Sequence, residues 1–166
     1  MIAEAVAAEK ALAEGSVEGI AGGASGGDIL FHEACQSAGV RTTVMLALPR
    51  DDFAAASVND AGGAWTERYR RLHDRSEVKV LAHSAELPAW LRARGDDYSI
   101  WQRNNRWILH TALSRADTDV TLIVLWDGKG GDGPGGTADL VALARRRGVK
   151  VVQLDATRLL GAPSGR

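Results

Sequence analysis

Cysteine is nearly absent from this chain of 166 residues, because only Cys35 is present. An internal disulfide and a metal site with several cysteines are therefore excluded. No stretch approaches the roughly 18 consecutive apolar residues of a membrane-spanning helix. The first residues include several acids, whereas a secretory signal needs a basic start and an apolar centre. These absences predict a cytoplasmic protein that has no membrane partner.

An excess of charge of one sign is also lacking, since the formal net charge is -1. Bulk electrostatic binding of nucleic acid or of anionic membranes is therefore not expected. With 45% hydrophobic and 25% charged residues, the chain has the balance of one soluble globular domain. We expect this domain to span residues 1–155 and to be followed by a flexible tail at 156–166.

Glycine, in contrast, is concentrated in two stretches that each follow an apolar run and lead into a helical pattern. The first, residues 22–28, reads Gly-Gly-Ala-Ser-Gly-Gly-Asp, and the second, residues 127–137, reads Asp-Gly-Lys-Gly-Gly-Asp-Gly-Pro-Gly-Gly-Thr. Glycine allows a tight turn and close approach of a ligand, and the N–H groups that begin a helix attract anions. Two such turns predict a single phosphate-binding crevice at the carboxyl edge of a sheet.

Apolar runs alternate with helical patterns along the whole chain. Strands are expected at 17–21, 42–48, 78–81, 120–126 and 149–154, and the main helices at 2–14, 29–38, 65–75, 99–113 and 138–147. Gly39 and Gly148 are expected to end the second and the last of these helices. Such alternation predicts an α/β fold with a doubly wound, mainly parallel sheet flanked by helices, as in Rossmann-like domains. Because these domains usually open with a strand, the initial helix predicts a domain that lacks its first strand and is fused to effector or regulatory domains.

The order of these motifs resembles the SLOG superfamily, a Rossmann-like group. That group includes LOG-type phosphoribohydrolases and the nucleotide-sensing domains of some bacterial defence proteins and TRPM channels. Residues 18–29 resemble its first strand, glycine turn and helix, and Pro-Gly-Gly-Thr at 134–137 resembles its Pro-Gly-Gly-x-Gly-Thr signature. Residues 101–108 lie where LOG-type enzymes carry an Arg-Lys pair. The resemblance implies binding of a nucleotide-derived ligand and is compatible with a homodimer.

The chain departs from the LOG-type pattern at two places that matter for catalysis. Three residues after Thr137, where those enzymes carry a catalytic glutamate, stands Leu140, and the nearest acid is Asp139. On a helix one residue is a rotation of about 100°, so this carboxylate is expected to face differently. The Arg-Lys pair is replaced by a polar run, Arg103, Asn104, Asn105 and Arg106. These departures weaken the hydrolase interpretation and leave ligand binding intact.

The residues predicted to bind the ligand come from the two turns and the helix between them. They are Gly22, Gly23, Ala24, Ser25, Gly26, Asp28, Arg103, Asn104, Asn105, Arg106, Lys129, Gly135, Gly136 and Thr137. Each has a structural alternative. Asp28 is equally well a first-turn acid stabilised by the helix dipole, and Thr137 an ordinary N-cap. The two asparagines are poor helix formers, so inside a helix they indicate a polar task.

No metal or cofactor is expected. His32 and Cys35 have the spacing of two metal ligands, but no second pair completes a site, and Cys35 is better interpreted as a small buried hydrophobe.

The leading hypothesis is a sensor or regulatory module for a nucleotide-derived signal, ADP-ribose-like or cyclic. The alternative is an enzyme that cleaves or transfers an N-glycosidic bond, either a phosphoribohydrolase or a deoxyribosyltransferase-like protein. In that enzyme Asp139 or Glu33 would stabilise the oxocarbenium-like sugar, and Arg103 or Arg106 would hold the phosphate. A third hypothesis is a protein interaction domain with a degenerate site.

Overall fold

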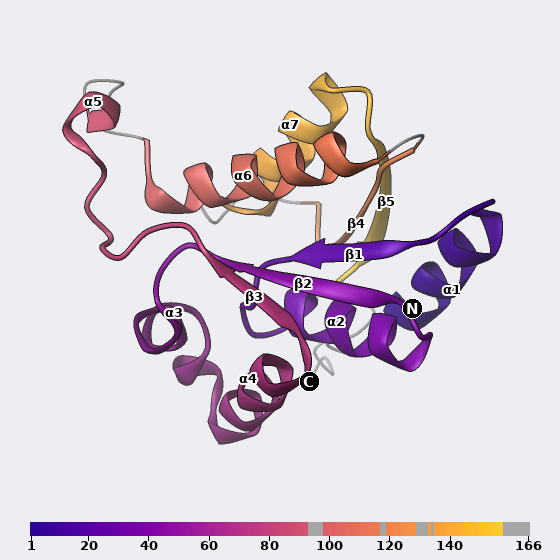
Figure 1. Ribbon diagram of the computed structural model, residues 1–166, viewed down its shortest axis with the longest axis horizontal. Helices are drawn as coiled ribbons and strands as arrows, with labels where there is room; N and C mark the ends of the chain where they lie inside the picture. The colour runs from indigo at the N-terminus through magenta and orange to yellow at the C-terminus, as the bar shows by residue number, and fades with distance from the viewer. Residues whose placement is uncertain (93–97, 117–118, 129–132, 134, 158–166) are drawn as a thin grey trace, which may run out of the picture.

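The computed structural model describes residues 1–92, 98–116, 119–128, 133 and 135–157 (Figure 1). Its strands are β1 (Glu18–Ala21), β2 (Arg41–Leu46), β3 (Glu77–Val80), β4 (Thr121–Trp126) and β5 (Lys150–Asp155). Its helices are α1 (Ile2–Leu12), α2 (Gly27–Ser37), α3 (Arg50–Ser57), α4 (Gly63–Arg75), α5 (Ala89–Arg92), α6 (Ile100–Arg115) and α7 (Thr137–Arg146), with a 3-10 turn at Asn59–Ala61. The five strands begin and end within two residues of the predicted bounds. Helix α5 was not predicted.

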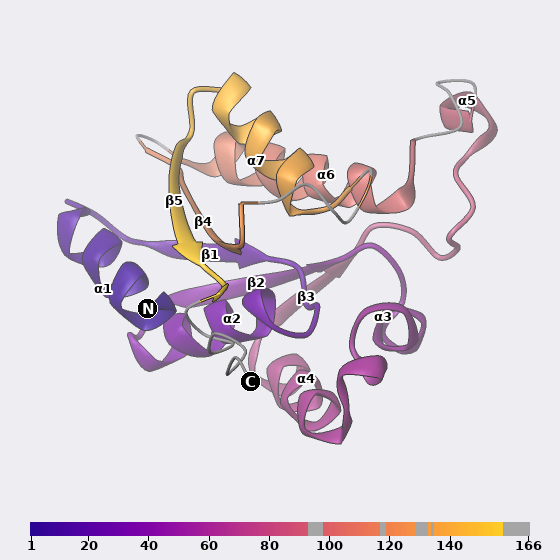
Figure 2. The same ribbon diagram turned by 180° about the vertical axis from the view of Figure 1, so that it is seen from behind.

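The strands are parallel wherever they pair, which confirms the predicted α/β class. They form a three-stranded sheet in the order β1-β2-β3 and a two-stranded sheet of β4 and β5. Helices α1, α2 and α4 lie on one side of these sheets, and α6 and α7 lie on the other (Figures 1 and 2). The fold is therefore doubly wound, as predicted.

The expected single sheet is divided into two, since among the described residues no ladder joins β1 to β4. Apolar packing holds the two sheets next to each other instead. Ile123, Leu125 and Leu154 of the second sheet pack against a buried cluster of Ile2, Val6, Cys35 and Val40. The helix pair α1 and α2 thus bridges both sheets. That the domain lacks its first strand stays a prediction.

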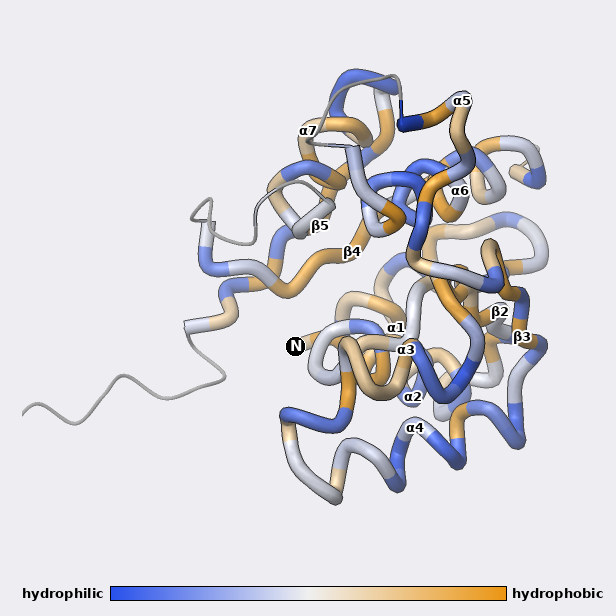
Figure 3. The backbone as a smooth tube through the Cα atoms, turned by 90° about the vertical axis from the view of Figure 1, so that its left-hand side faces the viewer, coloured by the Kyte–Doolittle hydropathy of each residue, from blue (hydrophilic) through white to orange (hydrophobic). Residues whose placement is uncertain are grey.

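The main core surrounds β2, which is covered on both faces. Residues 44–47 of this segment are fully buried. Val44, Leu46 and Ala47 share a core cluster with residues of the surrounding helices, among them Ile29, Phe53 and Tyr69. Burial on both faces explains why this strand reads as a continuous apolar run rather than an alternating one. Figure 3 shows the corresponding contrast between apolar strands such as β4 and the hydrophilic outer helix α4.

Short sequence signals mark the ends of α2 and α7 and the start of α6. Gly39 and Gly148 follow α2 and α7 with φ of +67° and +72°, the left-handed conformation that glycine adopts most readily. Ser99 and Gln102 form a capping box at the start of α6. In the part of the chain that the structure describes, no helix combines the length and the apolar character needed to cross a membrane.

Candidate functional site

The first glycine turn connects β1 to α2, and its first two glycines are required by packing. A Cβ on Gly22 would lie 2.5 Å from Oδ2 of Asp28. A Cβ on Gly23 would lie 3.0 Å from Leu46 and 3.1 Å from Tyr69. These two residues are buried in the described structure, so their lack of a side chain is explained without a ligand.

Two backbone donors of this turn are already engaged within the protein. The Ala24 N–H donates to Oδ2 of Asp28 at 3.1 Å, and the Ser25 N–H donates to the Ser57 carbonyl at 3.0 Å. Burial raises the pKa of Asp28, and the hydrogen bond from Ala24 opposes this effect. From the sequence, Asp28 was interpreted either as a ligand-binding residue or as a first-turn acid of the helix. In the structure its carboxylate accepts a hydrogen bond from the turn that precedes α2.

Gly26 is the open position of the first turn. It is the N-cap of α2 with φ of +93°, and no heavy atom beyond its chain neighbours lies within 4 Å of where its Cβ would be. The next residue, Gly27, approaches the carboxyl part of β4, because its Cβ would lie 3.7 Å from Cβ of Leu125. The turn therefore presents accessible backbone at the start of a helix, beside the end of β4.

His32 is a constituent of the first turn that the sequence reasoning missed. Its side chain is fully buried, and its Nε2–H donates to the Gly22 carbonyl at 2.9 Å. Burial lowers the pKa of His32 to about 4, so the imidazole is neutral near pH 7. The available signal was its position one helical turn after Asp28, but the sequence interpretation weighed only its spacing to Cys35.

The second glycine turn precedes α7 and is held against α6. Gly135 has φ of +93°, and a Cβ there would lie 2.8 Å from both the Gln102 backbone N and Cβ of Trp101. Asn105 Nδ2 donates to the Gly135 carbonyl at 2.7 Å. Gly136 is the N-cap of α7, and Thr137 is its first residue. The alternative that Thr137 caps this helix is wrong, because the N-cap is a glycine without a side-chain acceptor.

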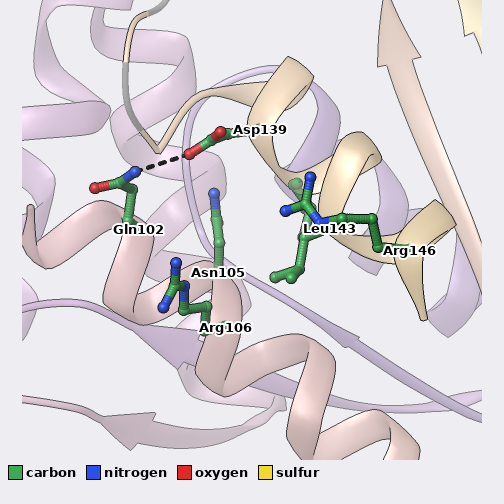
Figure 4. A pocket seen from close by; sticks show the side chains of 7 residues that line it. Gln102, Asn105, Arg106, Asp139, Leu143 and Arg146 are labelled. Atoms are coloured by element: carbon green, nitrogen blue, oxygen red, sulfur yellow. Dashed lines mark hydrogen bonds between the residues drawn. The ribbon is translucent and has the colours of Figure 1, made fainter. Parts of the chain in front are cut away.

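Asp139 braces the same turn. Its Oδ2 accepts hydrogen bonds from Gln102 Nε2 at 3.0 Å and from the Gly135 N–H at 3.1 Å (Figure 4). The Gln102 hydrogen bond, then that of Gly135, and further the positive charges of Arg106 and Arg146 lower the pKa of Asp139. Its carboxylate is therefore ionised, and both hydrogen bonds that it accepts come from the protein itself. Gln102 was not among the predicted residues, although its place three residues after Ser99 marks it as part of a capping box.

A hollow lies between α6 and α7 next to this turn (Figure 4). We call it the α6–α7 hollow, and it is lined by Gln102, Asn105, Arg106, Asp139, Leu140, Leu143 and Arg146. Its volume is about 60 Å³, whereas pockets for drug-sized ligands have roughly 300–1,000 Å³. Residues of the first turn do not line it. The α6–α7 hollow is thus not the single crevice that was predicted from the two turns.

The polar run of α6 is divided between structural and exposed roles. Asn104 is buried and donates from Nδ2 to the Met45 carbonyl at 3.1 Å. The polar role predicted for the two asparagines is therefore to donate hydrogen bonds to backbone carbonyls, Asn104 to that of Met45 and Asn105 to that of Gly135. Arg106 is exposed, with its guanidinium 5.1 Å from the centre of the Tyr98 ring. Arg103 is partly exposed and forms no ion pair with a described residue.

Two other predicted residues lie elsewhere. Glu33 forms a bidentate ion pair with Arg68 of α4, and the hydrogen bonds from this guanidinium lower the pKa of Glu33. Lys129 lies outside the described residues. Among the residues that the structure describes, no three His, Cys, Asp or Glu side chains gather as a metal site would require.

No family model, curated protein or solved structure matches the chain. The resemblance to the SLOG superfamily therefore stays a prediction that depends on the motifs at 18–29, 101–108 and 134–137.

Proposed function

We propose that this domain binds a nucleotide-derived ligand, ADP-ribose-like or cyclic, and acts as a sensor or regulatory module. The open backbone at Gly26 is the observation that carries the proposal. Packing accounts for Gly22 and Gly23, but nothing in the described structure occupies the space over Gly26. A positive φ and an empty approach at the start of an 11-residue helix are the features that phosphate-binding turns use.

The internal bonds of the turn support the same proposal. Asp28 and Ser57 hold the Ala24 and Ser25 N–H groups in place, so the turn is ordered before a ligand arrives. An ordered site loses less conformational entropy on binding than a flexible one. The contact of Gly27 with Leu125 places this turn beside the strand that leads to the second glycine stretch. A ligand at Gly26 would therefore lie beside the carboxyl ends of β1 and β4, the usual position in such folds.

Substitution of Gly26 by alanine is expected to abolish ligand binding while the matched change at Gly62 leaves it intact. Gly62 is also the N-cap of a helix, has φ of +99°, and has no atom within 4 Å of its Cβ position. Both glycines have a positive φ with an extended ψ, of -122° at Gly26 and 164° at Gly62, so alanine at either position carries a backbone strain of about 1–3 kcal/mol. ADP-ribose or cyclic AMP at ~100 times its dissociation constant should stabilise the parent protein by about 2.7 kcal/mol.

Thermal unfolding with and without these two compounds measures the effect, at roughly 2–4 °C per kcal/mol. The parent and Gly62→Ala proteins should shift, and Gly26→Ala should not. Equal shifts for both variants would place the ligand away from this turn. If neither compound nor other nucleotides stabilise the parent, the protein interaction hypothesis is favoured.

The second candidate function is N-glycosidic bond cleavage, for which Asp139, whose carboxylate accepts from the Gly135 N–H, is the candidate acid. We expect Asp139→Asn to keep ligand binding, because asparagine retains an oxygen that accepts from Gly135 and Gln102. We also expect no rapid release of free base from AMP or ADP-ribose by the parent protein. Chromatographic analysis of products measures this. Fast release of free base by the parent protein, lost in Asp139→Asn, would show that the protein is a glycosidase and not a sensor.

A further inference from the structure

Positive charge is concentrated on the two helices that cover one side of the sheets. Together α6 and α7 contain five arginines and a single acid, Asp139, although the chain as a whole has a net charge of -1. Only one of these arginines, Arg115, forms an ion pair with a described residue, at 2.8 Å from Glu18. The guanidinium groups of the others have no carboxylate of a described residue within salt-bridge distance.

Two of these four arginines line the α6–α7 hollow. Arg106 comes from α6 and Arg146 from α7, and both side chains line the hollow (Figure 4). The two amide residues, Gln102 and Asn105, lie on the α6 side of the hollow, and Leu140 and Leu143 line it from α7. A shallow, polar hollow with two guanidinium groups from separate helices has the chemistry of an oxyanion site.

Asp139 does not neutralise both arginines. Its Oδ2 already accepts two hydrogen bonds, from Gln102 and from Gly135, and neither arginine is within salt-bridge distance of it. One carboxylate against two guanidinium groups leaves a net positive charge of one in the hollow. With about 60 Å³ the hollow admits a few water molecules or one small anionic group. A nucleoside would not fit.

We propose that the α6–α7 hollow binds one phosphoryl group between the guanidinium groups of Arg106 and Arg146. The group has two possible sources. It is either free inorganic phosphate, acting as an effector separate from the ligand at Gly26, or a phosphate group within that ligand. Only the second source rests on the proposed nucleotide function.

The test compares neighbouring arginines. Arg145 and Arg146 both lie exposed in the last turn of α7, but only Arg146 lines the hollow. Each stabilises the negative end of the helix dipole, so alanine at either position has a matched structural cost. Calorimetric titration with inorganic phosphate at low salt should show binding at least about tenfold weaker for Arg146→Ala, and within about twofold of the parent for Arg145→Ala.

A second pair repeats the comparison on α6, where Arg106 lines the hollow and Arg103 does not. Arg106→Ala should lose phosphate binding as Arg146→Ala does, and Arg103→Ala should keep it. Asp139→Asn should bind phosphate more tightly than the parent, because it removes a repelling charge. Melting temperatures of the variants show that each is folded. Equal affinity of Arg145→Ala and Arg146→Ala, or no saturable binding by the parent, overturns the proposal.

The two sources are distinguished by titration with ADP-ribose and cyclic AMP. If Arg146→Ala weakens binding of either nucleotide, the hollow receives a phosphate group of the ligand. If it weakens binding of inorganic phosphate and leaves both nucleotides unchanged, the hollow is an independent effector site. If the parent protein binds inorganic phosphate but neither ADP-ribose nor cyclic AMP, the nucleotide proposal fails and the phosphate site stands, so the two failures are recognised separately.

Discussion

Replacing Gly135 by alanine is expected to lower the free energy of unfolding by about 3 kcal/mol, because it combines two costs. The left-handed conformation costs an alanine about 1–2 kcal/mol, and overpacking costs about 1–3 kcal/mol. The overpacking arises because the new Cβ would lie 2.8 Å from the backbone N of Gln102. A backbone atom at the start of α6 cannot move aside as the end of a flexible side chain can.

Gly133 is the matched control, since it lies in the same loop with φ of +65° and has no atom within 4 Å of its Cβ position. Gly133→Ala should therefore show the conformational cost alone, about 1–2 kcal/mol. Urea unfolding of both variants measures the difference. If the two substitutions lower the free energy of unfolding equally, the close approach of the second turn to α6 is wrong.

Acidification from pH 6.5 to pH 4 is expected to destabilise the protein through His32 by about 3 kcal/mol. In the unfolded chain this histidine binds a proton near its ordinary pKa of 6.5, whereas burial lowers its folded pKa to about 4. Between these values the unfolded state binds more protons, so stability rises with pH. The contribution is complete above pH 6.5 and is lost as the pH falls toward 4.

The His32→Gln variant isolates this effect, because glutamine has an amide donor for the Gly22 carbonyl but does not titrate. The free energy of unfolding of the parent should fall more steeply with acid than that of the variant. Asp28, whose pKa is raised by burial, acts in the opposite direction and is present in both proteins. His110→Gln, the same substitution at an exposed position of α6, is the matched control. A parent slope equal to that of His32→Gln would mean that His32 is not buried in the neutral form.

The local organisation of the chain could be predicted because it depends on short-range physics. Apolar runs located every strand that the structure describes, and the glycines at 39 and 148 marked helix ends through their backbone freedom. The two strand-to-helix turns could also be predicted from local sequence, because each glycine stretch lies between an apolar run and a helical pattern.

The partners of individual side chains could not be predicted, because they are far apart in the sequence. Gln102 meets Asp139 across 37 positions, and Asn104 meets the Met45 carbonyl across 59. The sequence showed that an asparagine inside a helix has a polar task, but the acceptor is a backbone carbonyl that only packing of α6 onto β2 brings near. For the same reason Glu33, a candidate catalytic acid, is instead the partner of Arg68 on another helix.

The sequence by itself determined the class of the fold, the order of its elements and the position of both glycine turns, because propensity and periodicity act within a few residues. The tertiary structure decided the rest. Contacts between distant segments close Gly23 but not Gly26, divide the strands into two sheets, and place Arg106 and Arg146 along one hollow. Those contacts are set by how the apolar faces pack, and that cannot be read from local patterns.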